Sequence, residues 1–160
     1  MRCRIGLLIV IIMITLASVN YSQQNADQAQ AGDKKAEEYY AKGNSLYESG
    51  RYLEAIKEYK QAIKLRPNSP ELYHNLGNTY YYLKRYNEAI SAYREAIEIN
   101  PNDSKTYNNL GNTYRFLKRY KESISACKQA IRINPNYSDA YSNLGLTYDD
   151  LKRYKEAISA

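Results

Sequence analysis

The side chains that most often act as nucleophiles, bases or metal ligands are scarce in this sequence. It contains one histidine, His74, and two cysteines, Cys3 and Cys127. His74 and Cys127 lie far apart in the chain, and no cluster of metal-ligand residues is present. The glycines are spaced too widely for a phosphate-binding loop. The sequence therefore predicts no enzyme, no cofactor and no metal site.

A different chemistry recurs along the chain, that of the side-chain amide. Asn44, Asn78 and Asn112 follow one another at intervals of 34 residues. An amide donates and accepts hydrogen bonds at once, so a ladder of amides suits the main chain of an extended peptide. Neighbouring tyrosines would add contact area at low entropic cost. The alternative is that these asparagines are ordinary surface residues of a helical repeat.

Composition limits the class of protein. The chain has 160 residues, 44% of them apolar and 25% charged, which is typical of a soluble domain or a short repeat array. It has 19 Tyr, one Phe and no Trp, so tyrosine, with a phenol to satisfy, does nearly all the aromatic packing. The net charge is +6, and Arg2 and Arg4 at the N-terminus supply two of these charges. So mild an excess disfavours nucleic acid as a partner.

A period of 34 residues organises most of the chain. Its clearest marks are four glycines: Gly43, Gly77, Gly111 and Gly145. Tyrosines, small residues and a closing proline recur with the same period: Tyr39, Tyr73, Tyr107, Tyr141; Tyr52, Tyr86, Tyr120, Tyr154; Ala55, Ala89, Ser123, Ala157; Ala62, Ala96, Ala130; Pro67, Pro101, Pro135. A fixed period of this length predicts a solenoid of stacked helical units.

The repeated residue types suit two packed helices per unit. Glycine inside a helix costs roughly 0.5–1 kcal/mol relative to alanine, so its recurrence indicates a close neighbour. We expect Gly77 on the first helix of its unit to meet Ala89 on the second. Pro101 ends the preceding helix, because proline cannot continue it. Ser69 followed by Pro70 is typical of a helix start.

These positions resemble the tetratricopeptide repeat pattern over residues 36–160. The second unit carries the pattern with Tyr where Trp is frequent: Tyr73, Leu76, Gly77, Tyr80, Ala89, Tyr93, Ala96 and Pro101. The third unit matches at Tyr107, Leu110, Gly111, Tyr114, Ala130 and Pro135, but has Ser123 and Cys127 at the small and aromatic positions. Cys127 is thus expected to be a buried packing thiol. Lys42 and Leu46 make the first unit an atypical end repeat.

The resemblance implies an all-α fold, a right-handed α-solenoid with units at 36–69, 70–103, 104–137 and 138–160. It also implies protein or peptide partners on the concave face, which the first helices line in this family. The corresponding residues are Tyr40, Asn44, Tyr47, His74, Asn78, Tyr81, Tyr82, Asn108, Asn112, Arg115 and Phe116. Some relatives grip a C-terminal carboxylate with Lys and Arg. Tyr40, His74 and Asn108 stand at those places, so this clamp is not expected.

Pairs of basic residues form a second repeated feature. They fall at the predicted turn between the two helices of a unit and would form a basic rim: Lys84, Arg85, Lys118, Arg119, Lys152 and Arg153. One interpretation is that they are solvated turn residues that pair with Glu88, Glu122 and Glu156. The other is attraction to an acidic partner or an anionic membrane surface, which salt would weaken.

Residues 1–19 have the pattern of a secretory signal peptide, with Arg2 and Arg4 before an apolar run over residues 5–17. Spanning a bilayer requires roughly 20 apolar residues, so residues 5–19 are short for a permanent anchor, which is the alternative. Residues 20–35 are rich in Gln and Ala without an apolar period. They predict a flexible linker, with Asp33 as a cap of the first repeat helix.

The sequence as a whole predicts an exported scaffold, periplasmic or secreted, that binds a partner segment on its concave surface. One alternative is the N-terminal recognition region of a larger exported or membrane-tethered enzyme, and another is a structural spacer. The fourth unit stops partway through its predicted second helix, where Tyr154, Ala157 and Ile158 would present an apolar face. We expect this end to continue in a longer chain or to be covered by a partner or a second copy.

Overall fold

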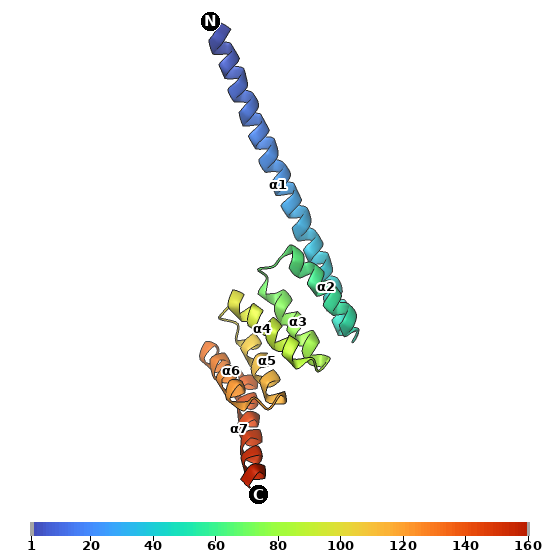
Figure 1. Ribbon diagram of the computed structural model, residues 1–160, viewed down its shortest axis with the longest axis vertical. Helices are drawn as coiled ribbons and strands as arrows, with labels where there is room; N and C mark the ends of the chain where they lie inside the picture. The colour runs from blue at the N-terminus through green and yellow to red at the C-terminus, as the bar shows by residue number, and fades with distance from the viewer. Residues whose placement is uncertain (1, 160) are drawn as a thin grey trace.

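The protein forms a stack of helices with one helix projecting from it. A computed structural model describes the backbone of residues 2–159 and the side chains of residue 13 and residues 20–153. The helices are α1 (Arg2–Glu48), α2 (Tyr52–Leu65), α3 (Pro70–Tyr82), α4 (Tyr86–Ile99), α5 (Ser104–Phe116), α6 (Tyr120–Ile133) and α7 (Ser138–Ser159). α1 extends well beyond the stack, and the two chain ends lie at opposite ends of the molecule (Figure 1). The predicted all-α fold is confirmed.

Each unit is a pair of helices joined by a short turn. The C-terminal part of α1 packs against α2, α3 against α4 and α5 against α6. α3 begins at Pro70 with Ser69 at its N-cap, and α4 ends at Ile99, before Pro101, as predicted. Consecutive odd-numbered helices also contact one another, whereas α2, α4 and α6 do not contact each other in the described residues. The odd-numbered helices therefore line the inner, concave face of the stack.

The core of the stack combines small residues with buried tyrosines. Ala55, Ala89 and Ala130 on the second helices are 0% exposed. Tyr59 and Tyr93, also on second helices, are 1% exposed. Because the small residues allow the helix backbones to approach, the large rings fill the remaining space between the helices of each unit.

Gly77 lies against an aromatic ring. A Cβ atom on Gly77 would stand 2.5 Å from Cε1 of Tyr93, so the nearest neighbour of Gly77 is this ring, one turn beyond the predicted Ala89. In the third unit a Cβ on Gly111 would stand 2.7 Å from Sγ of Cys127. Cys127 is 0% exposed and burial raises the pKa of its thiol, which confirms a buried packing thiol.

Residues 20–35 belong to α1 and do not form the predicted linker. The segment lacks an apolar period, but its Ala, Gln and Lys residues favour a helix and no proline interrupts them. Asp33 consequently caps no helix. Its carboxylate pairs with Nε of Arg66 at 3.0 Å, and Glu37 pairs with Nη1 of the same guanidinium at 2.8 Å. These two ion pairs connect α1 to the end of α2.

The predicted signal segment, residues 1–19, lies outside the side chains that the structure describes, except for residue 13. Across the part of the chain that is described, no helix is long and apolar enough to cross a membrane.

The fourth unit contains one helix where two are predicted. α7 runs without a turn through residues 151–153. In the second and third units the turn places Lys84 and Lys118 at a φ of 58°, which is strained for a residue with a side chain. In those two units the helix after the turn packs back against the first helix, whereas α7 continues as a single helix. Lys152 and Arg153 thus lie within a helix, and the side chains of Tyr154, Ala157 and Ile158 lie outside the described residues.

Candidate functional site

The concave face carries two pockets of the same construction. Pocket 1, a hollow of about 260 Å³, is lined by Asn44, Tyr47, Glu48, Tyr59 and Asn75. Pocket 2, of about 320 Å³, is lined by Tyr47, Asn78, Tyr81, Tyr82, Tyr93, Asn109 and Asn112. Every residue of pocket 1 has its counterpart 34 positions later in pocket 2. The repeat therefore builds equivalent pockets at the first two junctions between units, and the main chemical difference is that Tyr82 replaces Glu48.

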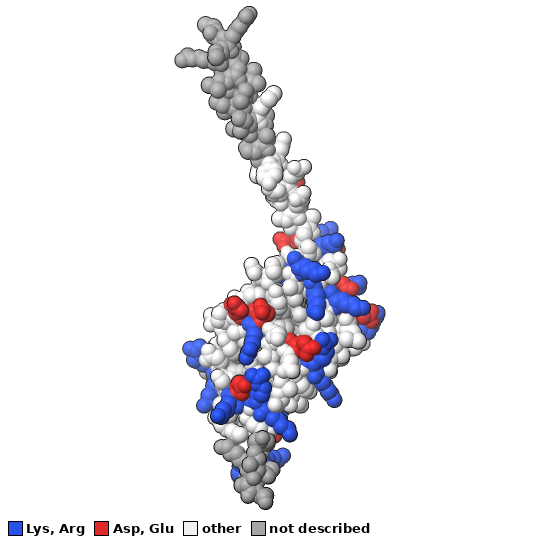
Figure 2. All heavy atoms as spheres, viewed as in Figure 1, with Lys and Arg blue, Asp and Glu red and all other residues white. Residues whose placement is uncertain are grey.

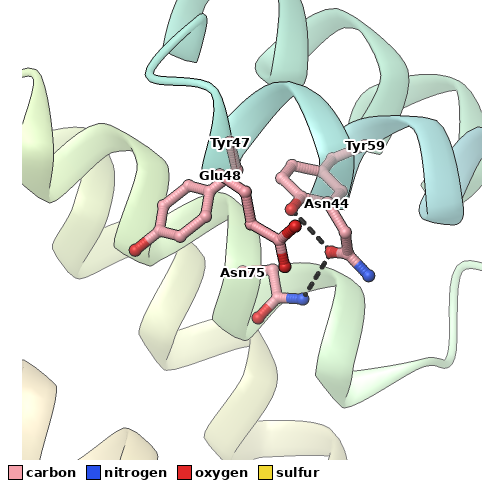
Figure 3. A pocket seen from close by; sticks show the side chains of 5 residues that line it. All are labelled: Asn44, Tyr47, Glu48, Tyr59 and Asn75. Atoms are coloured by element: carbon pink, nitrogen blue, oxygen red, sulfur yellow. Dashed lines mark hydrogen bonds between the residues drawn. The ribbon is translucent and has the colours of Figure 1, made fainter.

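An amide bridge frames pocket 1. Oδ1 of Asn44 accepts a hydrogen bond from the hydroxyl of Tyr59 at 2.7 Å and another from Nδ2 of Asn75 at 3.2 Å (Figure 3). The bridge joins α1 to α2 within the first unit and to α3 of the next. Both lone pairs of the Asn44 oxygen are then occupied, and within the described chain Nδ2 of Asn44 has no protein acceptor.

The same bridge frames pocket 2. Oδ1 of Asn78 accepts from the hydroxyl of Tyr93 at 2.7 Å and from Nδ2 of Asn109 at 2.9 Å. Asn112, the third amide of the predicted ladder, is bound differently: its Nδ2 donates to the hydroxyl of Tyr81 at 2.8 Å. In the first two amides the oxygen thus connects the units, and the NH₂ group is the part that a ligand could contact.

Two stacked pairs of aromatic rings lie near the pockets, and one of these four rings, that of Tyr82, lines pocket 2. The rings of Tyr52 and Tyr82 have centroids 5.5 Å apart at an interplanar angle of 14°. The equivalent pair, Tyr86 and Phe116, lies at 5.6 Å and 14°. Tyr82 is 56% exposed and Phe116 48%. These half-open rings offer apolar contact surface beside the amide donors.

The aromatic arrangement stops at the junction between α5 and α7. Arg115 and Asp150 stand where Tyr81 and Phe116 stand in the preceding junction, and Nη1 of Arg115 pairs with Oδ2 of Asp150 at 3.0 Å. Nη2 of Arg115 also donates to Oδ1 of Asn112 at 3.2 Å. The groove therefore changes from aromatic to ionic towards the C-terminal unit.

Four of the pocket tyrosines are held neutral by burial. Burial raises the pKa of Tyr47, Tyr59, Tyr81 and Tyr93. At Tyr59 the nearby Tyr40 and the negative charge of Glu48 raise the pKa further. Because these phenols keep their protons, the hydroxyls of Tyr59 and Tyr93 can donate to the ladder amides, as the observed hydrogen bonds require.

Five residues predicted for the concave face line neither pocket: Tyr40, His74, Asn108, Arg115 and Phe116. The hydroxyl of Tyr40 accepts from Nδ2 of Asn75 at 3.2 Å, and Tyr40 is half-buried. Asn108 is 5% exposed and its Oδ1 accepts from Nδ2 of Asn143 at 2.8 Å. The prediction that Asn108 faces a ligand is therefore wrong, because α7 packs over it.

His74, another of these five residues, is part of a hydrogen-bond chain at the start of α5. Oγ1 of Thr106 donates to Oδ2 of Asp103 at 2.5 Å and lies 2.6 Å from Nδ1 of His74. Since the Thr106 proton is committed to Asp103, Nδ1 of His74 must be the donor. Burial lowers the pKa of His74, against the opposing charge of Asp103. His74 thus has a structural role between the second and third units.

Two arginines of the predicted basic rim, Arg85 and Arg119, make contacts within their own units. Arg85 pairs with Glu88 at 2.6 Å, and its guanidinium lies 4.9 Å from the ring centroid of Tyr80. The third unit repeats both contacts, with Arg119 to Glu122 at 2.8 Å and to the Tyr114 ring at 4.7 Å. On the face shown in Figure 2, basic and acidic side chains are interspersed. These observations favour the interpretation of the rim as solvated, paired turn residues. The third predicted partner, Glu156, lies outside the described side chains.

Sequence reasoning missed five pocket residues: Glu48, Tyr59, Asn75, Tyr93 and Asn109. Asn75 and Asn109 could have been found, because with Asn143 they form a second ladder of the same period. Tyr59 and Tyr93 belong to second helices, which the resemblance assigns to the core, although their hydroxyls reach the groove. Among the described residues, no group of three or more His, Cys, Asp or Glu side chains is placed to hold a metal ion.

Comparison with known families identifies the repeat. Sequence profiles described as TPR repeat and tetratricopeptide repeat match residues 43–84, 70–103, 104–137 and 126–159. The chain belongs to the tetratricopeptide repeat family. No curated protein matches it.

Several solved structures share this fold. The first TPR domain of Spaghetti (RPAP3), bound to the HSP90 peptide SRMEEVD, is 27% identical with a TM-score of 0.72, over 75% of this chain and 95% of that chain. The first TPR domain of the human RPAP3 protein is 25% identical with a TM-score of 0.74, over 78% and 98%. The MamA protein is 27% identical with a TM-score of 0.71, over 84% and 71%.

Proposed function

We propose that this chain is a non-enzymatic interaction scaffold that binds an extended segment of a partner protein along its concave face. The observation that carries the proposal is the repeated pocket, in which amide donors and half-exposed rings recur at consecutive junctions. A related TPR domain holds a peptide, which supports the same mode of binding here.

The dimensions of the pockets favour side chains over whole small molecules. Pockets for drug-sized ligands are roughly 300–1,000 Å³ and mostly enclosed, whereas pocket 1 is about 260 Å³ and open to the groove. Consecutive pockets suit consecutive side chains of one segment. The free NH₂ groups of Asn44 and Asn78 would then donate to main-chain carbonyl groups between those side chains.

The partner segment differs from the acidic tail seen in the RPAP3 neighbour. A C-terminal carboxylate requires Lys or Arg at the places that Tyr40, His74 and Asn108 occupy here. Asn108 is buried and His74 is neutral, so neither supplies a positive charge. We therefore propose an internal segment as the ligand, held by its side chains and its main chain.

The proposal includes export of the protein. It is supported by the basic start and apolar run within residues 1–19, and tethering by residues 5–19 is the alternative. Expression in the source organism, followed by fractionation and N-terminal sequencing, tests both. A mature N-terminus near residue 20 supports a cleaved signal, and an intact N-terminus in the membrane fraction supports the tether. Intact protein in the cytoplasm contradicts export.

A capture experiment with matched variants tests binding in the groove. The full chain serves as bait, beside Tyr82→Ser with Phe116→Ser in the groove and Leu53→Ser with Leu65→Ser on α2. All four side chains are large and exposed, so both double variants should stay helical by circular dichroism. Partners lost only with the groove variant support the proposal. Partners retained by the groove variant contradict it.

A further inference from the structure

We propose that pocket 1 receives a cationic side chain, Lys or Arg, of the bound segment. This inference rests on the proposed function of the groove and names the chemistry that one of its pockets selects. It differs from the acidic ligand of the RPAP3 neighbour, whose peptide ends in Glu-Glu-Val-Asp.

The central observation is the position of Glu48. Its carboxylate points into pocket 1, between the ring of Tyr47 and the Asn44–Tyr59 hydrogen bond (Figure 3). Glu48 is exposed at the end of α1 and belongs to none of the ion pairs formed by the described residues. The pocket thus holds a negative charge that no neighbouring cation neutralises.

The donors around Glu48 are already committed elsewhere. The Tyr59 hydroxyl gives its proton to Asn44, and Nδ2 of Asn75 donates to Asn44 and to the hydroxyl of Tyr40. No described side chain donates a hydrogen bond to the carboxylate, and the free NH₂ group of Asn44 points away from it (Figure 3), so a ligand donor or water can satisfy it. A ligand group that carries a positive charge and several N–H donors would neutralise the carboxylate and also donate hydrogen bonds to it.

The walls of the pocket favour an organic cation over a metal ion. The Tyr47 ring forms one side and meets the Tyr82 ring edge-on at 5.6 Å, and an ammonium or guanidinium group is attracted to such aromatic faces. A calcium ion takes about 6–8 oxygen ligands, whereas Glu48 is the only carboxylate that lines this pocket. A single Lys or Arg side chain, inserted from the groove, suits the space.

Pocket 2 is an internal control for this inference. It repeats the amides and phenols of pocket 1 but has Tyr82 in place of Glu48, and it contains no charged residue. It should therefore accept a neutral side chain. The two pockets together predict that the bound segment contains a basic residue and an apolar or aromatic residue. The distance between these two residues should equal the distance between adjacent units.

Peptides of period three can test this prediction without knowledge of the register. Packed helix axes lie about 8–10 Å apart, and a polyproline II helix rises about 3.1 Å per residue with three residues per turn. A blocked peptide of four Lys-Pro-Pro triplets thus presents a lysine to each pocket, and the matched probes contain Gln-Pro-Pro or Glu-Pro-Pro triplets. Affinities are measured with the full chain by calorimetry, at low and high salt.

We expect the Lys peptide to bind about three- to tenfold more tightly than the Gln peptide, with the Glu peptide weakest. The variant Glu48→Gln should lose this preference for the Lys peptide over the Gln peptide. The control Glu98→Gln removes an exposed carboxylate on α4 that lines neither pocket, and it should retain the preference.

Three results overturn the inference: no binding of the Lys peptide, equal affinity for the Lys and Gln peptides, or a preference that survives Glu48→Gln. Its failure is distinguishable from failure of the proposed function. If Lys and Gln peptides bind equally and Tyr82→Ser weakens both, the groove binds segments but does not select a cation. The capture experiment above tests the groove without any of these peptides.

Discussion

The hydroxyl of Tyr93 on α4 donates a 2.7 Å hydrogen bond to Oδ1 of Asn78 on α3. The same tyrosine places its ring against Gly77 in the core. A single side chain therefore fills the space between the two helices and also fixes the orientation of a groove amide. Tyr59 repeats both relationships with Asn44 and Gly43 in the first unit. In this way packing within a unit determines which atom of the amide is available to a ligand.

We expect Tyr93→Phe to lower the free energy of unfolding by about 0.5–1.5 kcal/mol, because it removes a buried hydrogen bond and keeps the ring. Urea denaturation followed by circular dichroism measures the change. Tyr141→Phe is the control, since Tyr141 is 51% exposed. Equal effects of the two substitutions would contradict a stabilising role for the Tyr93–Asn78 bond.

Gly77→Ala and Gly145→Ala should change stability in opposite directions. At Gly77 the added Cβ would meet the buried Tyr93 ring at 2.5 Å, and such overpacking typically costs about 1–3 kcal/mol. At Gly145 nothing lies within 4 Å of the added atom, so the better helix propensity of alanine should stabilise by about 0.5–1 kcal/mol. Thermal unfolding of both variants tests this. Stabilisation by Gly77→Ala would contradict a close contact between Gly77 and the Tyr93 ring.

Lys84→Gly should stabilise the protein. Lys84 has a φ of 58°, and the first unit has Gly50 at the same position with a φ of 72°. Glycine relieves the strain of a side chain in this conformation, about 1 kcal/mol or more, and loses part of that gain through its more flexible unfolded state. Gly50→Lys, the reciprocal change, should destabilise. If both substitutions destabilise the protein, contacts of the Lys84 side chain contribute more to the stability of the turn than the strain of its backbone costs.

The stability should fall between neutral and mildly acidic pH because of His74. Burial holds its pKa below the ordinary 6.5, so as the pH drops the unfolded chain takes up the proton first. The free energy of unfolding then decreases from about pH 7 down to the pKa of the folded state. Glu88 and Glu122, whose pKa values are lowered by Arg85 and Arg119, titrate below this range.

Melting temperatures across about pH 7.5 to 5 measure this dependence. The variant His74→Gln should be less stable at neutral pH but nearly insensitive to pH in the same range. If His74→Gln keeps the full pH dependence of the wild-type protein, groups other than His74 cause that dependence.

The fold of units one to three could be predicted because its determinants repeat. Pro101 and the Ser69–Pro70 start are constrained by backbone geometry and Gly77 by the close Tyr93 ring, and a shared period places them in register. The groove could be predicted only in part. Asn44 and Asn78 were recognised through their spacing, but which amide atom faces the ligand depends on Tyr59 and Tyr93. The orientation of each amide is determined by the packing of these tyrosines, and the spacing of residues in the sequence does not specify that packing.

Two segments were predicted incorrectly because they depend on context outside a single unit. Residues 20–35 lack an apolar period, yet a helix needs no buried face where residue propensities favour it and α1 is already nucleated downstream. At residues 151–153 the local sequence matches the turns of the earlier units, but α7 continues through it as one helix, so the local sequence alone does not specify the turn. Glu48 was missed because it has no counterpart in the next unit, where Tyr82 replaces it.

Site-specific photocrosslinking tests the central claim, that the concave groove binds a partner segment, most directly. A photoreactive phenylalanine derivative is placed in the full chain at Tyr82 or Phe116 in the groove, or at Leu53 on α2. The chain is then irradiated in its native cells. We expect the same partner to crosslink from both groove positions and not from Leu53. Crosslinking of partners from Leu53, with none from Tyr82 or Phe116, would contradict the account and place the binding surface on the outer helices.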